Sequence, residues 1–259
     1  MRAGWVEVGG RRLETAQWGP SPAEAPAIVL LHEGLGCVAM WRGFPARLAE
    51  ATGCAVVAWS RAGYGASDPI VPPREVTYMH EEAAHWVRPV LDAAGIERCV
   101  LLGHSDGGSI AALYAGTQPD ARVRGLALLA PHFFVEDITI AGIEAARERY
   151  LNGDLRERLA RYHADVDGAF RGWNGAWLDP AFRAWNITHE AAGIRVPTLV
   201  VQGLADPYGS AAQVAALQAV AGAYVRPLLL EGVGHSPQLE AAEATLSAVA
   251  AFVADVMPP

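Results

Sequence analysis

The run Gly-His-Ser-Asp-Gly at residues 103–107 constrains the fold of this chain more than any other segment. We expect an apolar strand over 97–102 directly before it and a helix over 109–116, ending on glycine, directly after it. Such a sharp turn leaves Ser105 in a strained backbone conformation, and the flanking glycines let neighbouring chain pass closely. The pattern predicts a nucleophile elbow, with the serine hydroxyl exposed at the end of a sheet. The alternative is a serine that merely occupies a turn.

Short extended segments alternate with helical ones along most of the chain, which predicts an α/β fold with a mostly parallel central sheet flanked by helices. An antiparallel pair over 4–18, turning at Gly9-Gly10, is expected to open the sheet. Further strands are predicted over 27–32, 54–59, 97–102, 123–130, 197–202 and 224–230. Further helices are predicted over 41–51, 78–94, 210–221 and 239–253.

The pattern changes from Pro131 onward for about sixty residues. Residues 140–152 and 154–164 have helical periodicity, and no strand of the earlier kind is expected before Arg195. We therefore predict one core formed by residues 1–132 and 193–259, with residues 133–192 inserted as a helical lid. An insertion between two strands can cover the carboxyl edge of the sheet, where open α/β sheets bind ligands.

Composition excludes several classes of function. The chain has 259 residues and a formal net charge of −8, without a cluster of basic residues, so nucleic acid is not an expected partner. The longest apolar runs are too short to span a bilayer, and no export signal is indicated, so a soluble, cytoplasmic protein is expected. Three cysteines, at 37, 54 and 99, lack metal-ligand spacing. We expect no metal and no cofactor, and the oligomeric state is not indicated.

A serine hydroxyl needs a base, itself oriented by a carboxylate, to become a nucleophile near neutral pH. Asp206 follows the predicted strand over 198–202, and His235 follows the one over 227–230. Taken alone, each would be an ordinary loop residue. Their order after Ser105 is the one that an elbow requires, so we predict a triad of the three.

Two further positions enter the predicted site. Asp137, which follows the strand ending at Ala130, is the alternative acid. The backbone N–H of Asp106, at the start of a helix, is expected to stabilise the oxyanion of a tetrahedral intermediate. A second donor is expected from the loop His-Glu-Gly-Leu-Gly at residues 32–36.

These motifs resemble those of serine hydrolases of the α/β-hydrolase superfamily, and the resemblance covers both predicted core segments. It rests on the elbow, the loop beginning at His32, the Arg-Ala-Gly-Tyr-Gly-Ala-Ser turn at residues 61–67, and the Asp206 and His235 loops. The resemblance implies that Gly34 supplies the second oxyanion donor. The chain departs from the family pattern at Glu33, where glycine is usual. That carboxylate either turns away from the site or binds a polar group of the substrate.

The predicted lid is rich in aromatic residues, many of which would simply dock it on the core. A subset is expected to form an apolar substrate pocket together with the two polar residues beside the elbow. The expected substrate-binding residues are Glu33, His104, Phe133, Phe134, Trp173, Trp177 and Trp185. We therefore predict a hydrolase that cleaves a carboxylic ester or lactone with an apolar or aromatic portion, through an acyl-enzyme.

Two other functions share these motifs. The first is hydrolysis of a carbon–carbon bond in a vinylogous diketone acid, for which Arg183 or Arg147 could bind the substrate carboxylate. The second is a ligand receptor that keeps the triad and signals through its lid. Slow single-turnover kinetics with lid-dependent partner binding would distinguish a receptor from an enzyme.

Overall fold

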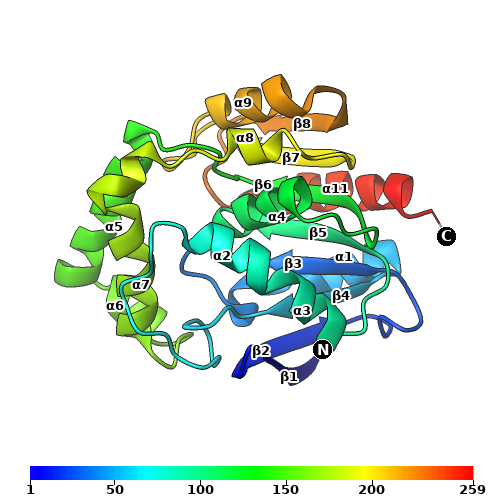
Figure 1. Cartoon of the computed structure of the whole chain (residues 1–259), viewed down its shortest axis with the longest axis horizontal. Helices are drawn as coiled ribbons and strands as arrows, with labels where there is room; N and C mark the ends of the chain where they lie inside the picture. The colour runs from blue at the N-terminus through cyan, green and yellow to red at the C-terminus, as the bar shows by residue number, and fades with distance from the viewer. Residues whose placement is uncertain (259) are drawn as a thin grey trace.

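The computed structural model describes residues 1–258, and its centre is an eight-stranded sheet in the order β1-β2-β4-β3-β5-β6-β7-β8 (Figure 1). The strands are β1 (Arg2–Val8), β2 (Arg11–Trp18), β3 (Ala27–Leu31), β4 (Ala55–Trp59), β5 (Cys99–His104), β6 (Val123–Leu129), β7 (Thr198–Gly203) and β8 (Val225–Leu230). The first two form an antiparallel hairpin, β2 also pairs antiparallel with β4, and the remaining pairs are parallel. This confirms the predicted fold class.

The central strands read as unbroken apolar runs because both of their faces are covered. In β3, every residue is buried, and alternate side chains enter different cores: Val29 and Leu31 one, Ile28 and Leu30 the other. Helices α2 (Tyr78–His85), α3 (Val87–Ala93), α4 (Asp106–Thr117) and α9 (Ala211–Ala221) pack into the first core. Helices α1 (Phe44–Thr52) and α11 (Ala242–Val256) pack into the second, on the opposite face.

Several predicted helices differ from the observed ones; the helix expected over 41–51 begins only at Phe44, and the helical pattern over 154–164 forms a helix only over Leu155–Leu159. The helix expected over 78–94 breaks at Trp86 into α2 and α3, because Pro89 lacks an N–H and its ring crowds the carbonyl four residues earlier. The helix after the elbow does not end at Gly116 but runs to Thr117. The closing helix is divided into α10 (Pro237–Glu240) and α11, because the backbone of Ala241 between them is not helical (φ −129°, ψ 51°).

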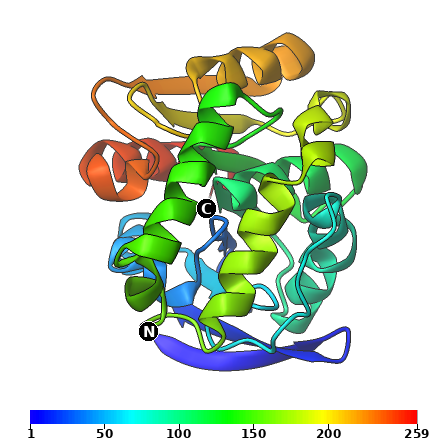
Figure 2. The ribbon, with the colours of Figure 1, turned by 90° about the vertical axis from the view of Figure 1, so that its left-hand side faces the viewer.

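The segment between β6 and β7 is helical, and its elements are α5 (Asp137–Asn152), α6 (Leu155–Leu159), α7 (Val166–Trp177), the 3-10 helix η2 (Pro180–Ala184) and α8 (Thr188–Ala191). Helices α5, α6 and α7 lie together beyond one end of the sheet, at the left of Figure 1. Figure 2 views that end directly, with α5 and α7 crossing in front of the strands. The short 3-10 helices η1 (Val38–Trp41) and η3 (Gly222–Tyr224) complete the fold. Within residues 1–258, no helix has the length and apolar character needed to cross a membrane.

Candidate active site

Ser105 occupies the sharp turn between β5 and α4, and its backbone is strained. Its φ of 51° and ψ of −121° are rarely adopted by a residue with a side chain, and such conformations cost on the order of 1–3 kcal/mol. The N–H of Ser105 donates to the carbonyl of Leu129 on the neighbouring strand (2.9 Å). A Cβ on Gly107 would overlap the carbonyl oxygen of Leu31, so only glycine allows the new helix to pass β3.

Ser105, His235 and Asp206 meet at the carboxyl ends of β5, β8 and β7. His235 Nε2 lies 2.9 Å from Ser105 Oγ, and His235 Nδ1 lies 2.8 Å from Asp206 Oδ2. The other oxygen of Asp206 accepts the N–H of Tyr208 (2.8 Å). Burial would raise the pKa of Asp206, but the hydrogen bond and charge of His235 outweigh it and lower that pKa. The carboxylate is thus held ionised, in the position to orient the imidazole.

Asp137, the alternative acid, lies elsewhere. It is the first residue of α5, its side chain is 98% exposed, and it pairs with Arg183 (2.7 Å). The Asp206 side chain is 1% exposed. The geometry therefore favours Asp206 as the partner of His235.

The loop after β3 is fixed from behind by two buried side chains. His32 Nδ1–H donates to the carbonyl of Glu33 (2.7 Å), while His32 Nε2 accepts the N–H of Arg61 (3.0 Å). Burial and the charge of Arg61 hold the pKa of His32 well below its usual range, so the ring stays neutral. The Arg61 guanidinium donates to the His32 and Glu33 carbonyls. Within residues 1–258 the N–H groups of Gly34 and Asp106 have no hydrogen-bond acceptor, which leaves both available to a substrate oxygen.

Only the backbone N–H of Asp106 was expected to take part in the site, but its side chain also makes two buried hydrogen bonds. It accepts hydrogen bonds from the hydroxyl of Tyr78 and from the indole N–H of Trp177 (3.3 Å). Burial raises the pKa of Asp106, and the charge of Arg61 and the Tyr78 hydrogen bond offset this only in part. The network links the elbow to α2 and to α7.

A cavity of about 120 Å³ opens at Ser105, and we call it the Ser105 pocket. It is lined by Glu33, Gly34, Leu35, Ser105, Asp106, His132, Thr139, Ile143, Trp173, Trp177, Tyr208 and His235. Helix α7 lies so close to the loop after β3 that a Cβ on Gly34 would overlap the indole nitrogen of Trp173.

The remaining residues expected at the substrate do not line this pocket. Phe133 is fully buried, and its carbonyl accepts the N–H of Ile187 (2.7 Å). Phe134 forms an isolated bridge with Asn186, and the ring of Trp185 stacks on Phe182 with 5.3 Å between centroids. Phe133 and Trp185 are buried and Phe134 is partly buried in the main core, so these three aromatic residues pack the inserted segment against its surroundings.

Glu33 and His104 form a partly buried pair at the edge of the pocket. Glu33 Oε2 lies 3.4 Å from His104 Nδ1, and the His104 Nε2–H donates to the carbonyl of His235 (2.7 Å). Burial opposes both charges, but the mutual hydrogen bond and attraction prevail, so the pKa of Glu33 is lowered and that of His104 is raised. His104 therefore holds the backbone of His235 in place through this hydrogen bond, whereas Glu33, with its side chain 24% exposed, reaches the pocket.

His132 lines the pocket and was missed in the sequence. It comes three residues after the end of β6, at the same sheet edge as the other site residues, and that position was the available signal. Its ring lies 5.8 Å from that of His235 and meets the indole of Trp177 edge-on. Burial lowers the pKa of His132 to about 3, so it faces the pocket as a neutral imidazole. In the described part of the chain its Nδ1 has no hydrogen-bond partner.

No group of three or more His, Cys, Asp or Glu side chains within residues 1–258 is arranged to hold a metal ion. The site brings together a serine, an imidazole, a carboxylate and two backbone N–H groups, an arrangement that can transfer an acyl group.

Comparison with known proteins gives a consistent result. Residues 26–175 match the family model for the alpha/beta hydrolase fold. RutD of Variovorax paradoxus (strain S110), to which carbamate hydrolysis is ascribed, is 31% identical over 211 residues, covering 73% of this chain and 76% of that protein. Epoxide hydrolase 4 of Mus musculus is 32% identical over 108 residues, 41% of this chain and 29% of that protein.

Among solved structures, the enol-lactonase from Burkholderia xenovorans LB400 has the same fold. It superposes with a TM-score of 0.75 over 96% of this chain and 99% of the enol-lactonase, at 24% identity. This chain belongs to the alpha/beta hydrolase family, because more than half of its length matches the family model and it is similar to RutD.

Proposed function

We propose that this protein is a serine hydrolase that cleaves a carboxylic ester or lactone through an acyl-enzyme. The observation that carries the proposal is the pair of hydrogen bonds at His235, one to Ser105 Oγ (2.9 Å) and one to Asp206 (2.8 Å). A base within hydrogen-bond reach of the nucleophile, itself oriented by a carboxylate, is the arrangement that activates a serine.

The reaction has two stages. Ser105 Oγ attacks the ester carbonyl carbon, its proton passes to His235 Nε2, and the oxyanion accepts the N–H groups of Gly34 and Asp106. The intermediate collapses, and the leaving alcohol takes the proton from His235. A water molecule then attacks the acyl-enzyme, His235 takes its proton, and the carboxylic acid leaves as the proton returns to Ser105 Oγ.

The form of the Ser105 pocket supports a small acyl group. Its volume of about 120 Å³ is well below the roughly 300–1,000 Å³ that holds a whole drug-sized ligand. We propose that residues 133–192 act as a lid over the core formed by 1–132 and 193–259. Its helix α7 supplies Trp173 and Trp177 to the pocket wall, so the lid would select the acyl group without taking part in bond making.

Carbon–carbon hydrolysis has less support, because the two arginines that could bind its acidic substrate are not at Ser105. Arg147 and Arg183 line a different cavity, beside α5 and η2. The carbamate hydrolysis ascribed to RutD concerns a carbonyl of related chemistry, so a carbamate belongs in the substrate panel.

The test is a panel of 4-nitrophenyl esters with acyl chains from acetate to decanoate, together with an aryl carbamate and a vinylogous diketone acid. We expect turnover of the short esters and a loss on the order of 10⁴-fold or more in Ser105→Ala, with unchanged circular dichroism. Ester turnover that survives in Ser105→Ala would refute the proposal.

A further inference from the structure

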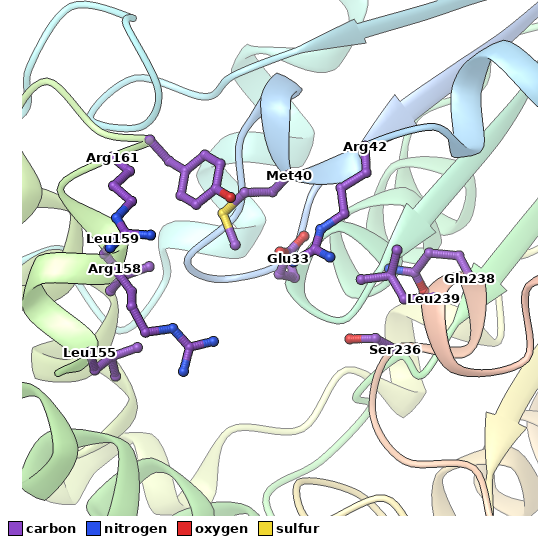
Figure 3. Close-up of a pocket in the computed structure, with 11 residues that line it drawn as sticks. Glu33, Met40, Arg42, Leu155, Arg158, Leu159, Arg161, Ser236, Gln238 and Leu239 are labelled. Atoms are coloured by element: carbon purple, nitrogen blue, oxygen red, sulfur yellow. The ribbon is translucent and has the colours of Figure 1, made fainter. Parts of the chain in front are cut away.

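A second cavity adjoins the Ser105 pocket, and three arginines converge on it. It has a volume of about 340 Å³, and Glu33 lines both cavities. We call it the arginine cavity, and its lining is Glu33, Met40, Arg42, Leu155, Arg158, Leu159, Arg161, Tyr162, Ser236, Gln238 and Leu239. In Figure 3, Arg42 comes from one wall, and Arg158 and Arg161 come from the facing wall.

The charge of this cavity is opposite to that of the molecule. The chain as a whole carries a formal charge of −8, yet three guanidinium groups and one carboxylate, Glu33, line the cavity. Glu33 is already paired with His104. Arg158 lies 3.9 Å from Asp154, whereas Arg42 and Arg161 form no salt bridge with any residue of 1–258. The cavity is therefore positively charged, with two guanidinium groups available to a ligand.

The backbone of Arg42 adopts a conformation that is strained for a residue with a side chain. It ends η1 with φ 53° and ψ −128°, a region that favours glycine. Its N–H donates only to the carbonyl of Ala39 (3.2 Å), and its side chain is exposed rather than packed in a core. Strained residues cluster at functional sites, so this conformation adds support for a role of the Arg42 side chain.

The position of the cavity identifies which part of a substrate would enter it. Ser236, Gln238 and Leu239 line it, and they directly follow His235, the residue that would protonate the leaving alcohol. The leaving group must lie next to His235 Nε2, so it can extend along this loop. The apolar side chains of Met40, Leu155, Leu159 and Leu239 suit a hydrocarbon or aromatic body.

We propose that the arginine cavity binds a carboxylate on the leaving-group portion of the substrate. The substrate would then be an ester of a small acid with a hydroxy acid, its carboxylate held by Arg42 and Arg161. Guanidinium groups are suited to this task because they bind carboxylates through two parallel hydrogen bonds. This inference rests on the proposed ester hydrolysis and specifies its substrate class. Glu33, at the junction of the cavities, would repel a carboxylate from the Ser105 pocket.

The test compares 4-acetoxybenzoate with methyl 4-acetoxybenzoate, which share the acetyl group and differ in one charge. For each ester, the kcat/KM of the parent protein is divided by the rate constant of its hydrolysis by hydroxide. We expect this ratio to be at least about tenfold higher for 4-acetoxybenzoate than for its methyl ester. Added salt should reduce this preference. Arg42→Gln and Arg161→Gln should each remove most of the preference by lowering the kcat/KM for 4-acetoxybenzoate. Arg47→Gln is the matched control, because Arg47 pairs with Glu243 on the surface outside the cavity.

Binding of the product 4-hydroxybenzoate, measured by calorimetry, separates this inference from the proposed function. We expect it to bind the parent protein more tightly than its methyl ester does, and to lose about tenfold in affinity in each arginine variant. If both esters are hydrolysed without preference and the affinity for 4-hydroxybenzoate is the same in the parent and in the arginine variants, the inference is wrong and ester hydrolysis stands. If neither ester is hydrolysed, the proposed function fails for these esters, and arginine-dependent binding alone decides the subsite.

Arg42→Gly adds a variant that should not lose stability, because glycine adopts this backbone conformation without strain. We expect an unchanged or higher melting temperature together with a weaker preference for the carboxylate. A lower melting temperature with an unchanged preference would give Arg42 a structural role and overturn its place in the subsite.

Discussion

Both carboxylate oxygens of Asp206 are engaged, and each contact orients the side chain toward the histidine. Oδ2 accepts from His235 Nδ1 and from Gln202 Nε2 (3.0 Å), and Oδ1 accepts the N–H of Tyr208. Asp206→Asn would leave the size of the side chain unchanged but stabilise the wrong tautomer of His235. We expect kcat for a short ester to fall on the order of 10⁴-fold.

Asp137→Asn is the matched control for that prediction, because Asp137 is exposed at the start of α5 and pairs only with the surface residue Arg183. It should keep the kcat of the parent. If Asp137→Asn loses activity and Asp206→Asn keeps it, the acid of the site has been assigned to the wrong residue.

The pair formed by Glu33 and His104 predicts a pH-dependent contribution to stability. The pKa of His104 is raised, so its share is fully present below its ordinary value of 6.5 and is lost as the pH rises through the higher folded value. The pKa of Glu33 is lowered, so its share is present above its ordinary value of 4.5 and is lost as the pH falls through the lower folded value. Both contributions to stability are therefore fully present between about pH 4.5 and pH 6.5.

Melting temperatures of the parent and of Glu33→Gln across pH 3 to 9 check this prediction. The difference between the two should be largest inside that window and should shrink on both sides. Glu50→Gln, on the exposed face of α1, serves as control and should show no such maximum. A difference that does not vary with pH would mean that the two side chains do not titrate as a pair.

At the scale of elements, α7 lines the pocket, while the chain after it docks the helical segment. Trp173 belongs to the wall of the Ser105 pocket, whereas Trp185 stacks on Phe182 and is not among the lining residues. Trp173→Ala should therefore shift the preferred acyl group to longer chains, because it enlarges the pocket. Trp185→Ala should keep the acyl preference and lower the free energy of unfolding by roughly 3–5 kcal/mol.

The ester panel and urea unfolding of the two variants measure these effects separately. Circular dichroism confirms that each variant is folded at the assay temperature. If Trp185→Ala changes the acyl preference and Trp173→Ala does not, the wall of the pocket has been wrongly identified.

At the scale of the whole molecule, features set by local pattern could be predicted from the sequence. The central strands were predictable because burial on both faces demands continuous apolar runs, as in β3. The meeting of Asp206 and His235 with Ser105 followed from chain order, since parallel strands bring their carboxyl ends to one edge of the sheet. The break at Trp86 could also have been predicted, although one helix over 78–94 was expected, because Pro89 cannot continue a regular helix.

Features that depend on convergence in space were not predictable in this way. Arg42 follows η1 and Arg161 follows α6, and nothing in either local sequence shows that they face one cavity. The aromatic content of residues 133–192 could not say which face each ring occupies, so Trp173 and Trp185 were grouped together. The contact of Asp106 with Trp177 likewise depends on how α7 lies across the elbow.

The central claim is that Ser105 is the nucleophile, and covalent labelling tests it most directly. The parent protein is treated with diethyl 4-nitrophenyl phosphate, and the site of the added diethylphosphoryl group is located by peptide mass spectrometry. The account predicts one label per chain, on Ser105, with loss of esterase activity in proportion to labelling, and no label in Ser105→Ala. A label on another residue that abolishes activity, or full esterase activity in Ser105→Ala, would contradict it.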